Sequence, residues 1–189
     1  MQWNDHSRIP DGAHAFLGAS QYHWLNYDDE RLRARYAAHV AAVQGTRLHN
    51  FAKECILLRQ HLPRSNKTLC AYVNDALGYN MRPEQKLVYS PNCFGTADAI
   101  SFKESTGFLR IHDLKTGSVK ASMHQLEIYA AQFCLEYGII PGDIEMELRL
   151  YQNNDFVVAH PTVEVIAPIM DKIVHFDKII ESMKEDIDG

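Results

Sequence analysis

The sequence predicts an α/β fold with a central mixed β-sheet flanked by helices. Three features indicate it: helical periodicity before residue 78, short apolar segments rich in β-branched residues at about 79–160, and an amphipathic stretch at about 163–186. With 189 residues and 46% hydrophobic content, the chain can bury one sizeable core. We therefore expect a single domain, 1–189, with a helical N-terminal part at about 14–78.

The N-terminal part is predicted to be helical throughout. In residues 14–27, Ser20 is a candidate cap for a short helix. A long helix follows from Asp28, and we expect it to break or kink near Gly45-Thr46. Its second half carries apolar residues at three- and four-residue steps, an amphipathic stripe predicted to face the core: Leu48, Phe51, Ala52, Cys55, Leu58 and Leu62. A short helix ending at Gly78 comes next.

The middle of the chain is predicted to hold about three strands, a helix and two more strands. The strands fall within 82–95, 94–102 and 109–115, and the helix within 122–137. Strict alternation at 144–150 predicts a half-buried strand, which turns at 153–155 into another. This order of helices, about three strands, a helix, two strands and a closing helix indicates an α/β domain with a central mixed sheet.

Asp113 and Lys115 end one of these strands, just before the turn Thr116-Gly117. Side chains two residues apart on a strand point to the same face, so a carboxylate and an ammonium lie side by side. His112 points to the opposite face. An Asp-x-Lys pair on a strand is more often an ordinary solvated ion pair, so other residues have to support a functional interpretation.

Asp98 supplies that support. It lies between Ala97 and Ala99 in an apolar segment, where a charge is costly unless it is paired or bound to a metal. A hairpin through the turn at 103–107 would place Asp98 beside Asp113. Two carboxylates at adjacent strand ends suit Mg²⁺ or Mn²⁺. Lys115 could then orient or deprotonate a water, or neutralise charge in a transition state, as metal-dependent phosphodiester cleavage requires.

Taken together, these residues resemble the PD-(D/E)xK nuclease superfamily. Asp98, Asp113-Leu114-Lys115 and the helical Gln125-x-x-x-Tyr129 are similar to its RecB-like branch, which includes CRISPR-adaptation nucleases and phage-encoded exonucleases. The segment 45–49, which ends in His49, matches an upstream histidine element. The resemblance spans roughly residues 45–137. No single motif is specific, but the ordered set is.

The resemblance implies a restriction-endonuclease-like core at about 79–160 and a role for each motif residue. His49, Asp98, Asp113 and the Leu114 backbone carbonyl would bind metal, and Lys115 would be catalytic. Gln125 and Tyr129 would support the site or touch DNA, although by spacing alone they could mark a boundary between core and surface. A secondary candidate for an additional acid is Glu84, near the start of the first strand.

Charge and cysteine content limit the interpretation further. A net charge of −5 is unusual for a protein that grips phosphates, so basic surface must be local. Candidates are Arg31, Arg33, Arg35, Lys53, Arg59, Arg64, Lys67 and Lys120. The four cysteines are scattered, which favours neither zinc nor disulfides. Relatives of the CRISPR-adaptation type often carry four cysteines for an iron–sulfur cluster in a different arrangement, so we expect no cluster here.

Three functions remain open at this stage. The preferred one is a metal-dependent DNA exonuclease in recombination, repair or phage DNA processing. An endonuclease is the second, and a non-catalytic nucleic-acid-binding or assembly subunit is the third. The implied partners are single- or double-stranded DNA ends and no membrane; a homo-oligomer or a recombination or replication partner is left open. Without an 18-residue apolar run or signal-peptide pattern, we expect a cytoplasmic protein of a bacterium or phage-infected cell.

Overall fold

The computed structural model describes residues 7–8, 10, 12–117 and 119–188. Their contacts divide the chain into two compact units, residues 1–44 and 45–189. The first unit holds the 3-10 helix η1 (Ala19–Asn26) and the first part of α1 (Asp29–Leu57). The second holds the rest of α1, the whole sheet and every predicted site residue.

The second unit is built on a five-stranded sheet in the order β1-β2-β3-β4-β5. The strands are β1 (Arg82–Ser90), β2 (Cys93–Lys103), β3 (Phe108–Leu114), β4 (Glu145–Gln152) and β5 (Asp155–Ala159). Only β3 and β4 pair in parallel; the other neighbours are antiparallel. The predicted α/β class with a mixed sheet is confirmed.

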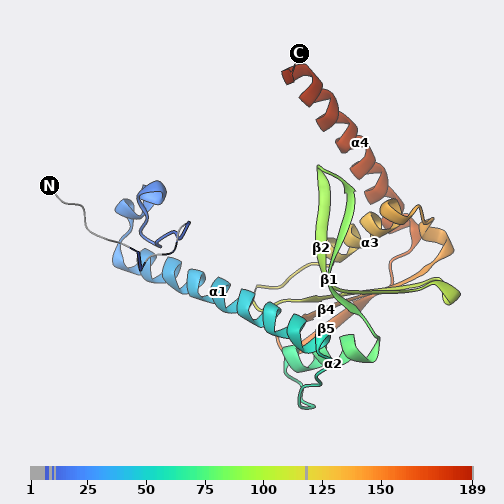
Figure 1. Cartoon of the computed structure of the whole chain (residues 1–189), viewed down its shortest axis with the longest axis horizontal. Coiled ribbons are helices and arrows are strands. Elements are labelled where there is room, and N and C mark those ends of the chain that lie inside the picture. The colour runs from blue at the N-terminus through green and yellow to red at the C-terminus, as the bar shows by residue number, and fades with distance from the viewer. Residues whose placement is uncertain (1–6, 9, 11, 118, 189) are drawn as a thin grey trace. The chain divides into compact units, whose positions relative to one another are not determined.

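Helices cover both faces of this sheet, and Figure 1 shows α2 (Thr68–Gly78) and α3 (His124–Tyr137) on opposite sides of it. One core cluster packs α3 and the start of α4 (Val163–Asp188) against alternate residues of β3 and β4, including Ile111 and Leu148. The other packs α1 and α2 against Ala99, Leu114 and Tyr151. Among the described helices, none combines the length and apolar content of a membrane span.

The N-terminal helices differ from expectation in three ways. The predicted break at Gly45-Thr46 is wrong, because α1 is continuous through it. Instead, Gly45 is buried against β3's end: a Cβ there would lie 2.7 Å from Thr116 Oγ1. The predicted Ser20 cap is also wrong, since η1 begins at Ala19 without a side-chain cap.

The third difference is the buried face of α1, which is narrower than the predicted stripe. Ala52 and Cys55 are buried as expected, together with Ile56. Three other members, Leu48, Phe51 and Leu58, are exposed. The face turned to the sheet instead follows 45, 49, 52 and 56, the three- and four-residue steps of a helix. This face carries glycine and histidine in place of leucine, so apolarity alone did not reveal it.

Strand β4 alternates as predicted but is not half exposed. Met146, Leu148 and Leu150 enter the α3-side core, while Glu147 on the other face is only 8% exposed. There, Arg149 Nε and Arg110 Nε each lie 2.9 Å from Glu147 Oε1. Burial alone would raise the pKa of Glu147, but these two guanidinium groups lower it. The polar face is therefore an internal ion-pair network.

His112 belongs to this buried polar face. Its Nδ1 lies 3.3 Å from the hydroxyl of Tyr151, which donates to Asp75 Oδ2 at 2.7 Å. The imidazole is fully buried, and this burial, together with Arg149 and Arg110, lowers its pKa to about 3. At neutral pH His112 is an uncharged core residue, consistent with its predicted position opposite Asp113.

Buried, neutral His112 should make the fold acid-sensitive. In the unfolded chain this histidine is protonated below about pH 6.5. In the folded chain it is protonated only below about pH 3. Stability should therefore fall as pH drops from 6.5 toward 3, at up to about 1.4 kcal/mol per pH unit from this group. Urea unfolding at pH 7 and pH 4.5 measures the change.

The matched variants are His112→Gln and His124→Gln. His112→Gln should lower stability at pH 7 but shrink its loss between the two pH values. The side chain of His124 is 82% exposed, so His124→Gln should keep the full loss. An equal loss in wild type and His112→Gln would contradict the assignment.

Candidate metal and catalytic site

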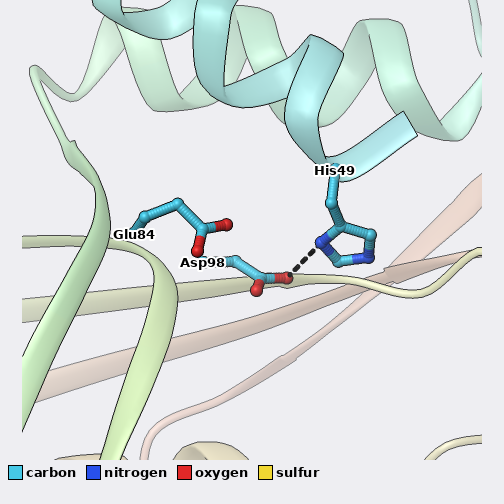
Figure 2. Close-up of side chains that lie close together, drawn as sticks. All are labelled: His49, Glu84 and Asp98. Atoms are coloured by element: carbon cyan, nitrogen blue, oxygen red, sulfur yellow. Dashed lines mark ion pairs between the residues drawn. The ribbon is translucent and has the colours of Figure 1, made fainter. Parts of the chain in front are cut away.

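Three side chains from separate elements meet at one point beside the sheet. His49 comes from α1, Glu84 from β1 and Asp98 from β2, and one ligand atom of each lies within 4.8 Å of the others. Figure 2 shows the His49 ring pointing from its helix toward the Asp98 carboxylate. The Nδ1–Oδ2 distance is 3.4 Å. One imidazole and two carboxylates form a suitable ligand set for a divalent cation.

An irregularity in β2 brings Asp98 to this point. Ala97 and Ile100 both pack in the α3-side core, while Ala99 packs in the core on the α1 and α2 side. Strict alternation would put 97 and 99 on one face, so the strand changes face between them. Such local irregularities re-aim side chains next to functional sites.

Glu84 faces Asp98 across the β1–β2 ladder, between the paired positions Pro83↔Ala99 and Gln85↔Ala97. Its backbone has φ +50°, a left-handed conformation that costs about 1–3 kcal/mol for a non-glycine residue. Strain of this kind persists where the surrounding structure enforces it. Here the strained backbone of Glu84 holds its carboxylate beside that of Asp98.

The electrostatics of the three groups suit a cation. Burial and the charge of Asp98 raise the pKa of Glu84, so its carboxylate is destabilised where it lies. The hydrogen bond to Asp98 raises the pKa of His49, against the effect of burial. A divalent cation between them would relieve the repulsion between the carboxylates and would bind the neutral form of His49. These residues fit a Mg²⁺ or Mn²⁺ ion.

Asp113 and Lys115 form the second half of the site. Asp113 is 1% exposed, and Lys115 Nζ lies 3.1 Å from its Oδ1 and 2.9 Å from its Oδ2. Only the contact with Oδ1 has hydrogen-bond geometry, which leaves Oδ2 buried without a hydrogen bond among the described residues. Burial and Asp98 raise the pKa of Asp113, while Lys115 opposes them.

Helix α3 holds the ammonium from the other side. Lys115 Nζ donates to Gln125 Oε1 at 2.6 Å, and Gln125 Nε2 donates to Tyr129 Oη at 2.9 Å. Gln125 and Tyr129 are one turn apart on one face of the helix. Two acceptors, Asp113 and Gln125, therefore orient the amine.

A single backbone group joins the two halves. The N–H of Leu114, which lies between Asp113 and Lys115, donates to Asp98 Oδ2 at 2.9 Å. The antiparallel ladder of β2 and β3 ends at Ala99↔His112, so Asp98 and Asp113 occupy the next positions along it. The hairpin predicted from sequence thus places these two residues side by side.

The structure arranges the candidate ligands differently from the resemblance. His49 and Asp98 share a cluster as expected, but its third member is Glu84, the secondary candidate. Asp113 is instead held by Lys115. The Leu114 carbonyl as a ligand stays a prediction.

Two supporting residues escaped the sequence analysis. A Cβ at Gly95 would lie 2.7 Å from Tyr129 Cε1, so this glycine admits the tyrosine ring; an isolated glycine within a strand is a known signal of close approach. Gln152 holds the loop after Lys115: it donates to the carbonyls of Gly117 and Val119, both at 2.7 Å, and accepts from Ala121 N–H. No local pattern marks Gln152.

Comparisons with family models, curated proteins and solved structures found no match for this chain. Its function has to be inferred from the site itself.

The cluster predicts that Glu84 contributes to metal binding. Replacing Glu84 with Gln keeps its size but removes a ligand charge, so Mn²⁺ affinity should fall at least about tenfold. Isothermal titration of the purified chain with Mn²⁺ measures this. Glu54→Gln is the matched control, because Glu54 is exposed on the same helix as His49 and lies outside the cluster. Equal affinities for wild type and Glu84→Gln would remove Glu84 from the ligand set.

Proposed function

We propose that this protein is a metal-dependent nuclease that hydrolyses phosphodiester bonds in DNA. One observation carries the proposal: a buried carboxylate and a helix glutamine orient the Lys115 ammonium beside a cluster of one histidine and two acids. Structural ion pairs are more often exposed and have no neighbouring ligand set. Perturbed pKa values of Glu84, Asp113 and His49 concentrate here, as is common at functional sites.

The chain's own residues divide the work between them. His49, Glu84 and Asp98 would hold a divalent cation, which when bound polarises the scissile phosphate and lowers the pKa of a nearby water. Lys115 would orient the attacking water and balance the negative charge that develops on the phosphate. Gln125 and Tyr129 act as positioning residues, because they reach the reacting atoms only through Lys115.

Positive charge near the cluster also favours an anionic substrate. Lys53 follows His49 by one helical turn on α1, and its charge lowers the pKa of Glu84. With a net charge of −5 on the whole chain, such local cations matter for binding phosphates. An exonuclease remains the preferred activity because Gln125-x-x-x-Tyr129 resembles the exonuclease-rich branch.

The first test is a degradation assay with end-labelled linear and closed circular DNA, in Mg²⁺, Mn²⁺ or EDTA. The wild-type protein should degrade linear DNA in Mg²⁺ or Mn²⁺ but not in EDTA, and should leave circular DNA intact. Lys115→Ala should lower the rate at least about 100-fold, the scale of a lost acid–base or charge-stabilising group. Lys103→Ala is the control, since Lys103 is an exposed lysine of the same sheet.

The outcomes separate the alternatives. Cleavage of circles would indicate an endonuclease. An unchanged rate in Lys115→Ala would refute the site, and DNA binding without cleavage in either metal would favour a non-catalytic subunit.

Gly95→Ala should impair the site from a distance. The added Cβ would lie 2.7 Å from the Tyr129 ring, so the ring must move and weaken its support of Gln125 and Lys115. We expect kcat to fall roughly tenfold, with little change in KM. Tyr129→Phe should mimic the loss, whereas Gly78→Ala, which meets nothing within 4 Å, should not. Full activity in Gly95→Ala would show that Tyr129 does not position the lysine.

A further inference from the structure

A cavity of about 290 Å³ opens beside Lys115, on the side away from Gln125's helix. It lies where α1, the first turn of α2, the end of β3 and the β4–β5 turn meet, all within the second unit. Its lining residues are Leu48, Thr68, Leu69, Leu114, Lys115, Thr116, Asn153 and Asn154. The nuclease chemistry described above uses only Lys115 and the Leu114 backbone.

The lining combines an apolar surface with neutral polar groups. Three leucines supply the apolar part, and hydroxyls and amides supply the rest. None of the eight lining residues is acidic. Lys115 lines the cavity, while its ammonium is held by Asp113 and Gln125. A group of atoms that is flat, largely apolar on its faces, polar at its edges and attached to a phosphate matches this surface. A nucleoside has this composition.

The polar rim is held in place before any ligand binds. Asn153 and Asn154 both have left-handed backbones, with φ of 55° and 60°, as the tight β4–β5 turn requires. Asn154 Oδ1 accepts from Thr68 N–H at 3.2 Å, and Thr68 Oγ1 accepts from Asn154 N–H at 2.7 Å. These bonds occupy the first N–H of α2. They leave the Asn154 amide nitrogen as a donor.

We infer that this cavity binds one unpaired nucleoside, base and sugar, of the strand whose phosphate is cleaved beside Lys115. The inference rests on the proposed nuclease function and adds a substrate subsite to it. A volume at the lower end of ligand pockets suits one nucleoside rather than two. The exposed Leu48 would pack against the base, and the amides of the turn would meet its edge.

Small diesters test the subsite directly. Thymidine 5′-(p-nitrophenyl phosphate) carries a nucleoside, whereas methyl p-nitrophenyl phosphate does not. Wild type should cleave the first with a kcat/KM at least about tenfold higher. Leu48→Trp, which fills the cavity, should reduce this ratio to near one. Leu57→Trp is the control, because Leu57 is exposed on the same helix and outside the lining.

Binding without turnover gives a second readout. In EDTA, dTMP should bind wild type at least about tenfold more tightly than 2-deoxyribose 5-phosphate, which lacks the base. Asn153→Gly suits the left-handed backbone but removes the amide, so it should weaken dTMP binding. Asn80→Gly, at another left-handed asparagine outside this cavity, should not.

The results distinguish failure of the subsite from failure of the nuclease. Cleavage of both diesters with equal kcat/KM, or a ratio unchanged in Leu48→Trp, would overturn the nucleoside subsite and keep the nuclease. Equal binding of dTMP and 2-deoxyribose 5-phosphate would also overturn it. A chain that cleaves neither diester nor DNA but prefers dTMP would overturn the nuclease and retain the nucleoside pocket.

Discussion

The carboxylate of Asp98 connects three segments that are far apart in the sequence. It accepts the Leu114 N–H of β3, lies 3.4 Å from His49 of α1 and faces Glu84 across the ladder with β1. A charged group between two buried alanines would be costly if it lacked such partners. Asp98 therefore links the cluster of His49, Glu84 and Asp98 to the strand that carries Lys115.

A second constraint is the desolvation of Asp113. Its buried carboxylate has a raised pKa because burial and Asp98 both disfavour the charge, and the Lys115 ammonium offsets part of that cost. A cation close to both aspartates would offset more of it. The repulsion between the two aspartates is therefore only partly balanced by the chain's own charges.

Regular periodicities made most of the fold predictable. Alternation placed Asp113 and Lys115 on one face of β3, and the four-residue step placed Gln125 and Tyr129 on one face of α3. The turn at 103–107 correctly set Asp98 next to Asp113. These relations are local, or they follow from hairpin pairing, so they can be inferred without knowledge of the tertiary structure.

The departures arose where tertiary packing overrides local preference. Glu84 adopts a left-handed backbone conformation, which the sequence around it does not predict. The buried face of α1 passes through Gly45 and His49, which apolar periodicity does not select. Gln152 is distant in sequence from the loop that it holds. In each case the deciding partner lies on another element, and a single sequence does not identify that partner.

The Lys115 ammonium contacts Asp113 of its own strand and Gln125 of α3. Both contacts can form only if α3 lies close to the sheet. The fully buried Ala130 and Ala131 bring the helix close, and Gly95 leaves room for the Tyr129 ring. Small residues at these positions therefore set how closely α3 approaches the sheet and the Lys115 ammonium.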